Sequence, residues 1–214
     1  MKTVSVINQK GGVGKSTTAE MLISALSLKG FKVLAIDLDA QGNLSYSLAA
    51  NLDSPTILEV LTEEISAKDA IKKARADVIS SNKALAGADA FIADTGKEYR
   101  LKEALEKIAK NYDFCIIDTP PALGILTINA LTASDSVIIP AQADIYSLQG
   151  IENLEETIKA VKKYCNPNLK IEGILLTRYN PRTILSREVS EMAEKLAEKL
   201  ETKLFKAKIR DAVA

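Results

Sequence analysis

Short apolar runs alternate along the chain with longer stretches in which apolar residues recur every three or four positions. The runs are rich in Val, Ile and Leu and are continuous rather than alternating, which is typical of strands buried on both faces of a sheet. They are Thr3–Ile7, Phe31–Ile36, Phe114–Ile117, Ser136–Ile139 and Ile171–Leu176. The predicted helices are Lys15–Leu28, Tyr99–Lys110, Ile125–Thr132, Gly150–Lys163 and Ser186–Glu198.

This alternation predicts an α/β fold. Its order implies a mostly parallel, twisted sheet with right-handed crossovers and with helices on both faces. The stretch 52–96 is less regular, and we expect it to hold short helices and one strand near Val78–Ile79. The sequence contains no recognisable linker, low-complexity tract or internal repeat. Its 214 residues suit one domain, residues 1–214, with a sizeable core.

Composition narrows the range of functions. Lys and Arg number 28, as do Asp and Glu, so the net charge is zero and any basic surface for nucleic acid must be local. Histidine is absent, and Cys115 and Cys165 lie in unrelated contexts, which excludes histidine chemistry and argues against disulfide or zinc frameworks. The N-terminus lacks the features of a signal peptide, and no apolar stretch reaches about 18 residues. We therefore expect a soluble, cytoplasmic protein without a transmembrane segment.

A glycine-rich turn between the first strand and the first helix carries the strongest chemical signal. Its glycines allow backbone N–H groups to close around phosphate oxygens, and the helix that follows adds its N-terminal dipole. Lys15 can neutralise the β- and γ-phosphates, and the Ser16 hydroxyl can ligate Mg²⁺. This context predicts a P-loop. The predicted phosphate-binding residues are Lys10, Gly11, Gly12, Val13, Gly14, Lys15, Ser16 and Thr17.

Aspartates follow two of the apolar runs. Asp37 and Asp39 occupy alternate positions at the end of the second run, so they would point to the same side if the strand continues. Asp118 ends the run FCIID before Thr-Pro-Pro. All three would lie at the carboxyl edge of the sheet, where open α/β folds bind ligands. Carboxylates beside a triphosphate are favourable mainly when Mg²⁺ is present, so the pattern predicts a metal–nucleotide site.

The P-loop departs from the strict pattern because Gln9 stands where a glycine is expected, while a second lysine, Lys10, opens the motif. Two lysines flanking Gly-Gly-Val-Gly resemble the deviant Walker A signature of the ParA/MinD ATPases. The segments DLDAQGN, with Ala40 in place of proline, YDFCIIDTPPALG and IEGILLTRYNPRT also resemble ParA, the chromosome and plasmid partition ATPase. The resemblance covers nearly the whole chain and implies a P-loop NTPase fold with ATP/ADP and Mg²⁺ as cofactors.

The resemblance also implies roles for single residues. Lys10 would reach the phosphates of the partner subunit across a two-fold dimer, so Lys10 and Lys15 are both candidate catalytic residues. Asp39 would orient or activate the attacking water and, with Ser16 and Asp118, would belong to the metal site. Asp37 would support the metal and phosphate site. Asp118 resembles a Walker B aspartate, which holds Mg²⁺ opposite Ser16.

In this family the ATP-bound homodimer binds DNA without sequence preference, and hydrolysis is stimulated by ParB or another small adaptor protein. The resemblance therefore implies a nucleoid-associated protein. Arg182, in NPRT, matches a DNA-contact position best, and Arg210 is next. Glutamates interleave with these basic residues, so a solvated charged face remains an alternative. The further candidates are Arg178, Arg187, Lys203, Lys206 and Lys208.

Two other functions compete with DNA partition. A MinD-like ATPase would position a protein complex at a membrane or on the nucleoid. The membrane form needs an amphipathic C-terminal helix, and Lys195–Arg210 is amphipathic but mixed in charge. A metabolic relative, such as an iron–sulfur ATPase or a ligase, is the other, although the two cysteines are not paired for a cluster. ParA proteins usually continue past the last residues of this sequence with an IPRN-like segment, an adenine-side loop and a final helix. We expect that end of the family fold to be missing here, which bears on adenine binding and dimer stability.

Overall fold

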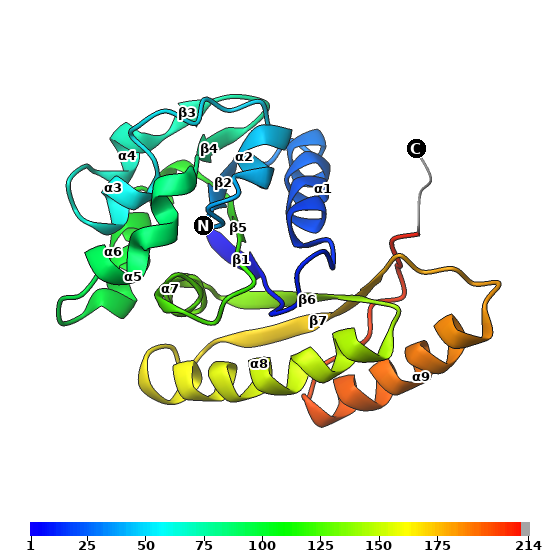
Figure 1. The fold of residues 1–214 in the computed structure, drawn as a ribbon. Helices are drawn as coiled ribbons and strands as arrows, with labels where there is room; N and C mark the ends of the chain where they lie inside the picture. The colour runs from blue at the N-terminus through cyan, green and yellow to red at the C-terminus, as the bar shows by residue number, and fades with distance from the viewer. Residues whose placement is uncertain (211–214) are drawn as a thin grey trace.

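The computed structural model describes residues 1–210 and, within that range, all side chains except those of Ile145, Tyr146 and Gln149. The predicted parallel sheet is confirmed (Figure 1). Seven strands form one sheet in the order β3-β4-β2-β5-β1-β6-β7, and all neighbours are parallel except β3 and β4. The strands are β1 (Lys2–Val6), β2 (Val33–Asp37), β3 (Lys72–Lys73), β4 (Asp77–Ile79), β5 (Phe114–Asp118), β6 (Ser136–Gln142) and β7 (Lys170–Thr177).

Helices cover both faces of the sheet, as the sequence predicted (Figure 1). The larger ones are α1 (Lys15–Leu28), α6 (Arg100–Glu106), α7 (Ile125–Ala133), α8 (Ile145–Tyr164) and α9 (Ile184–Lys199). Short helices and 3₁₀ turns fill the irregular stretch and flank α6. They are α2 (Asn43–Ser47), α3 (Ile57–Leu61), α4 (Ala67–Ala70), α5 (Ala88–Phe91), η1 (Lys83–Gly87), η2 (Lys97–Tyr99) and η3 (Ala109–Asn111).

Alternate residues of β2 pack into different cores on the two faces of the sheet. In β2, Val33 and Ala35 pack with α1 and α2 on one face, whereas Leu34 and Ile36 pack with α3, α6 and α7 on the other. A third cluster joins β6 and β7 to α8 and α9. Every residue of β2 is buried. Burial on both faces is the physical reason why the strands read as continuous apolar runs.

Some predicted boundaries were wrong. The second strand begins at Val33, because Phe31 closes the turn after α1 and packs edge-to-face on Phe114. The predicted helix Tyr99–Lys110 is α6 with a 3₁₀ turn on either side, and the break places Ile108 in the core. Helix α8 begins five residues before the predicted Gly150, because Asp144 caps it by accepting the N–H of Ser147. The prediction of one domain over residues 1–214 stays a prediction, since residues 211–214 lie outside the described part.

The chain after α9 runs beside β7 without forming a regular strand. Its backbone exchanges hydrogen bonds with Ile174, whose N–H donates to Lys203 O and whose carbonyl accepts from Phe205. Gly173 makes this close approach possible. A Cβ built on Gly173 would lie 2.7 Å from the Phe205 ring and 2.8 Å from the Lys203 carbonyl oxygen.

Gly173→Ala is therefore expected to destabilise the nucleotide-free protein by about 1–3 kcal/mol, the usual range for an overpacked site. Urea unfolding would measure the change. Gly11→Ala is the matched control, because a Cβ there meets nothing within 4 Å. Equal free energies of unfolding for Gly173→Ala and the parent would contradict the packing argument.

Candidate nucleotide-binding site at the phosphate loop

The phosphate loop connects β1 to α1 at the carboxyl edge of the sheet, as predicted. Gly12 and Gly14 adopt left-handed conformations, with φ of 73° and 88°, which residues with a Cβ rarely adopt. Gly14 is also the N-cap of α1 and provides no side chain to cap the first turn. Because the first N–H groups of a helix lack intrahelical partners, this end of α1 can bind an anion.

Two buried side chains that the sequence analysis did not single out hold the loop in place. Asn8 donates its amide to the Pro140 carbonyl at 2.7 Å and accepts the Lys10 N–H at 2.9 Å. Thr177, at the end of β7, donates its hydroxyl to the Val13 carbonyl at 2.8 Å. Asn8 stands inside the motif NQKGGVGKST, so its position was a usable signal, whereas nothing in the sequence pairs Thr177 with Val13.

The loop forms one wall of a cavity of about 400 Å³. That volume lies within the usual range of small-molecule sites. The other lining residues come from the segments that follow β2 and β5. The lining residues are Gly11, Gly12, Gly14, Lys15, Ser16, Thr17, Asp39, Gln41, Asn43 and Pro121. The structure thus brings Lys15, Ser16 and Asp39 together, as the sequence predicted.

Lys15 is 7% exposed and is the main cation of this cavity wall. Its ammonium donates to the Lys10 carbonyl at 3.3 Å. Burial lowers the pKa of Lys15 below its ordinary value, and the nearby carboxylates of Asp118 and Asp39 oppose that effect. A phosphate group would replace this weak bond with a charge-assisted one.

Asp118 ends β5, near Ser16 and Lys15 of the loop, and is fully buried. Among the described residues, neither of its carboxylate oxygens has a hydrogen-bond partner. Burial raises the pKa of Asp118 to about 7, against smaller opposing effects of the nearby Ser16 hydroxyl and Lys15. A buried carboxylate without a partner is costly, and a divalent cation beside Ser16 would relieve that cost.

Asp37 and Asp39 have different surroundings. Asp37 is fully buried and accepts bonds from the Asp39 N–H and from both the N–H and the hydroxyl of Ser45. Burial raises its pKa despite these bonds. Its contacts favour a positioning role for the turn that carries Asp39, rather than direct contact with a nucleotide. Asp39 is partly exposed, lines the cavity and accepts only the Gln41 N–H through its side chain.

The Lys10 ammonium is directed to the start of α8 and not to this cavity. The cavity lining, taken over the described residues, does not include it. Its ammonium instead contacts Asp144 Oδ1 and Oδ2 at 3.0 and 2.8 Å and Ser147 Oγ at 3.1 Å. Burial raises the pKa of the Asp144 carboxyl, but the bonds from Lys10 and Ser147 outweigh burial and hold the pKa below its ordinary value. Asp144 was missed in the sequence, although it follows a buried strand and precedes Ser147 by three residues, which is a helix-cap pattern.

A second cavity of about 330 Å³ shares Gly12, Gly14 and Thr17 with the first and extends it toward the C-terminal segment. Arg178 and Arg210, predicted as DNA contacts, both line it. Arg178 adopts φ 48°, an uncommon conformation for a residue other than glycine. The structure therefore separates these two arginines from the other DNA candidates and places them beside the phosphate loop.

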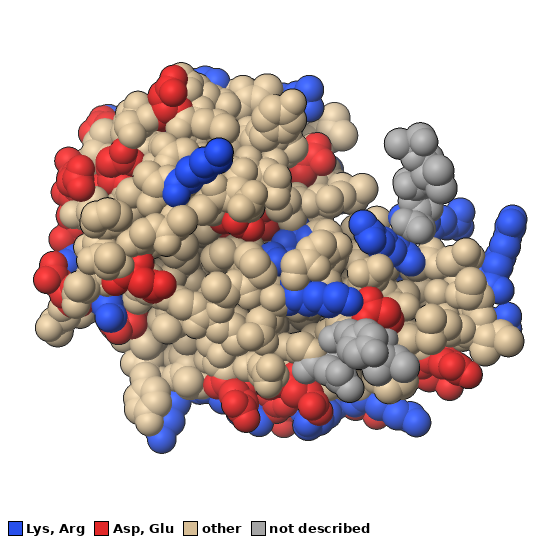
Figure 2. Space-filling model, in the orientation of Figure 1, with Lys and Arg blue, Asp and Glu red and all other residues tan. Residues whose placement is uncertain are grey.

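The remaining basic candidates lie on or near the C-terminal segment and the turn before α9. Arg182, Arg187, Lys203 and Lys206 are exposed. Lys208 is partly buried, stacks 4.0 Å from the centre of the Tyr179 ring and donates to Ser190. In Figure 2, blue side chains gather at the end of the molecule that carries α9 and the C-terminal segment, whereas red ones prevail over α3–α6. A local basic surface thus exists despite the zero net charge.

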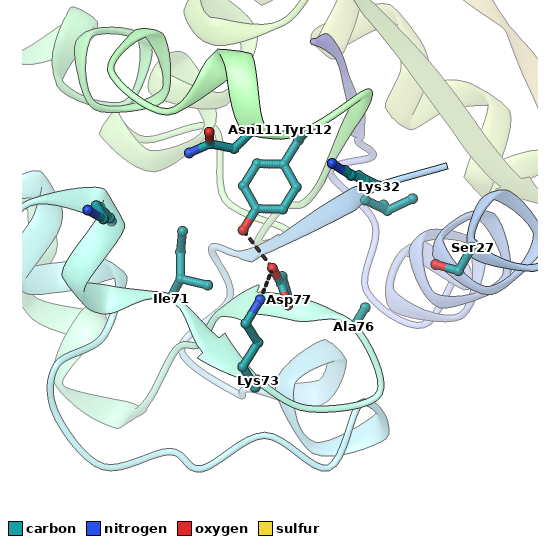
Figure 3. Close-up of a pocket in the computed structure, with 10 residues that line it drawn as sticks. Ser27, Lys32, Ile71, Lys73, Ala76, Asp77, Asn111 and Tyr112 are labelled. Atoms are coloured by element: carbon teal, nitrogen blue, oxygen red, sulfur yellow. Dashed lines mark hydrogen bonds and ion pairs between the residues drawn. The ribbon is translucent and has the colours of Figure 1, made fainter. Parts of the chain in front are cut away.

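Another hollow, of about 640 Å³, lies at the opposite edge of the sheet, at the amino ends of β2 and β4 (Figure 3). Its acid, Asp77, accepts bonds from Lys73 and from the Tyr112 hydroxyl. Parallel strands bind ligands at their carboxyl ends. The hollow therefore has no part in the phosphate site.

Comparison with known proteins identifies the family. The family model of the AAA domain matches residues 1–171. The sporulation initiation inhibitor protein Soj of Bacillus subtilis is 44% identical over 201 residues, which are 91% of this chain and 79% of Soj.

Solved structures agree with this match. Cobyrinic acid a,c-diamide synthase from Mycobacterium smegmatis, bound to an ATP analog and magnesium, superposes with a TM-score of 0.92 at 37% identity, over 99% of this chain and 88% of that one. A plasmid partition protein from Borrelia burgdorferi superposes with a TM-score of 0.79 at 30% identity, over 89% and 84%. Together with the deviant phosphate loop, these matches show that the chain belongs to the ParA family of P-loop partition ATPases.

Proposed function

We propose that this chain is an ATP-dependent switch for DNA partition. It binds ATP with Mg²⁺, forms a homodimer and in that state holds DNA without sequence preference. Hydrolysis, stimulated by a ParB-like or other small adaptor protein, then releases the DNA. Such a protein would act in the cytoplasm on the nucleoid.

The unpartnered Asp118 carboxylate is the observation that carries the nucleotide–metal part of the proposal. It lies near Ser16 and Lys15, and oxygen ligands of this kind suit Mg²⁺. Among residues 1–210, no three His, Cys, Asp or Glu side chains are placed to hold a metal ion by themselves. Magnesium is thus expected to bind together with the phosphates of ATP or ADP, held by Ser16 and Asp118, and it would stabilise the charge on those phosphates.

Lys15 and Asp39 are suited to roles in ATP hydrolysis. Both residues line the cavity that would hold the phosphates. Asp39 accepts one backbone bond, which leaves carboxylate lone pairs for a water molecule. We assign to Asp39 the orientation of the attacking water and to Lys15 the neutralisation of the phosphates. The base and ribose would extend into the adjoining cavity lined by Arg178 and Arg210.

DNA binding rests on the exposed basic residues near the C-terminal segment. Arg182 is exposed in the turn before α9, where its N–H is held by the side chain of Asn180 at 3.0 Å. The described part of the chain has no helix long and apolar enough to cross a bilayer. Lys195–Arg210 is not a continuous amphipathic helix, because α9 ends at Lys199 and the following residues pair with β7. This arrangement favours DNA over the membrane-positioning alternative.

The proposal predicts DNA binding that requires ATP. Fluorescence anisotropy of a labelled duplex should rise with ATP and Mg²⁺, but not with ADP or without nucleotide. Arg182→Ala should weaken this binding. It should also make the fall of log affinity with log salt shallower, by about one unit of slope for each arginine that contacts a phosphate. ATP affinity should stay unchanged.

Lys68→Ala, which removes an exposed lysine from α4, is the control and should behave as the parent. If DNA affinity is the same with and without ATP, the partition proposal fails, and a ligase-type activity becomes the better reading. The name of the Mycobacterium smegmatis synthase supports that alternative. If DNA binding requires ATP but Arg182→Ala binds DNA as well as the parent does, the DNA surface lies elsewhere.

A further inference from the structure

The ammonium group of Lys10 is fully occupied within its own chain. A lysine ammonium has three N–H donors, and three acceptors surround Lys10 Nζ: both carboxylate oxygens of Asp144 and the hydroxyl of Ser147, all within 3.1 Å. Lys10 therefore cannot approach a phosphate without giving up at least one of these bonds.

The acceptors are anchored and cannot follow the lysine. Asp144 caps α8 by accepting the Ser147 N–H at 2.8 Å, and α8 is 20 residues long. The backbone of Lys10 is fixed as well, because its N–H donates to the buried Asn8. Only the side chain of Lys10 is left to move, by rotation away from α8.

We propose that Asp144 and Ser147 form a latch that holds Lys10 in the monomer and opposes dimer formation. This inference rests on the proposed function, in which Lys10 binds the partner's phosphates. Two latches must open for each dimer, so the effect on the association constant is the square of the effect for one chain. Asp144 sets the concentration at which ATP drives association.

The size of the effect follows from the exposure of the pair. The side chains of Lys10 and Asp144 are 33% and 26% exposed. Ion pairs accessible to solvent typically change an equilibrium by up to about fivefold. The dimer association constant should therefore rise by up to about 25-fold when the charge on Asp144 is removed.

The Asp144→Asn variant tests the latch while keeping the helix cap. Asparagine caps helices about as well as aspartate, so α8 should keep its start, while the charge that holds Lys10 is lost. Ser147→Ala removes one bond to Lys10 without changing the net charge, and should give a smaller rise in the same direction. Asp69→Asn, on α4, makes the same charge change far from the phosphate loop and should have no effect.

Sedimentation equilibrium of the full chain with Mg²⁺ and a non-hydrolysable ATP analogue would measure the association constants. We expect the association constant to be highest for Asp144→Asn and intermediate for Ser147→Ala. The parent and Asp69→Asn should share the lowest value. Equal or weaker association of Asp144→Asn would overturn the latch, because Asp144 would then be neutral or would orient Lys10 for the partner. Absence of a dimer in every variant would instead contradict the proposed function.

A second readout tests the latch without a dimer. Acetic anhydride labels accessible amines, and mass spectrometry gives the rate at each lysine of the nucleotide-free protein. Lys10 should react several-fold faster in Asp144→Asn than in the parent, while Lys2 and Lys68 serve as internal references. An unchanged rate at Lys10 would show that Asp144 does not restrain it, whatever the state of association.

Discussion

Replacing Lys15 with alanine is expected to reduce the affinity for ATP with Mg²⁺ by at least about 100-fold, or roughly 2.7 kcal/mol. Lys15 is the buried cation of the phosphate cavity, and its ammonium has only a 3.3 Å bond to a backbone carbonyl to give up. Charge-assisted bonds to phosphate in such a site are about twice as strong as neutral ones. Isothermal titration calorimetry would measure the loss.

The fold should survive this change. Burial already lowers the pKa of Lys15, so the charged form is not a strong source of stability in the nucleotide-free protein. Lys29→Ala is the matched control, since Lys29 is exposed at the other end of α1. Parent-like ATP affinity in Lys15→Ala would mean that the cavity at the loop is not the nucleotide site.

Asp118→Asn should have two opposite effects. We expect it to stabilise the nucleotide-free protein by about 1–3 kcal/mol above pH 7, because it removes the charge from a buried carboxylate that has no hydrogen-bond partner in the described structure. It should also abolish the strengthening of ATP binding by Mg²⁺, since an amide is a poor ligand for that ion compared with a carboxylate. Thermal unfolding and ATP titrations with and without Mg²⁺ would measure the two effects.

The stability gain should depend on pH. Folding raises the pKa of Asp118 from 3.8 to about 7. Between these values the folded state binds more protons than the unfolded state, so the stability of the parent falls as pH rises. The difference between Asp118→Asn and the parent should therefore be absent near pH 4 and complete above pH 7.

Asp53→Asn, an exposed change of the same kind, should show neither the gain nor its pH dependence. If Asp118→Asn is less stable than the parent at pH 8, the carboxylate has a stabilising partner and is not held ready for a cation. If Mg²⁺ still strengthens ATP binding in the variant, the metal ligand on the protein is another group.

Much of the site could be predicted from local sequence. The phosphate loop, Asp39 and Asp118 each follow a buried strand, and parallel strands bring such positions to one edge of the sheet. The resemblance to ParA was confirmed by the comparisons. The length of α6 could not be predicted from the sequence. Its 3.6-residue pattern continues past Glu106, where the helix ends and Ile108 packs into the core.

Other features depend on residues far apart in the chain. Thr177 holds Val13 across 164 positions, and Asp144 holds Lys10 across 134. Each contact joins a residue at or just after the end of a strand to the segment before α1, and no local pattern encodes it. The position of Arg178 and Arg210 beside the loop also depends on the C-terminal segment, which lies along β7.

The sequence by itself determined which groups can meet a phosphate, because a glycine turn between a strand and a helix creates its own anion site from backbone geometry. It also determined the two-sided burial of the strands through their apolar runs. Only the tertiary structure decided the charge state and the direction of those groups. Among the described residues, Asp118 has no hydrogen-bond partner whereas Asp37 accepts three hydrogen bonds, and the start of α8 holds the Lys10 ammonium away from the cavity, since solvation and pairing depend on the neighbours that folding supplies.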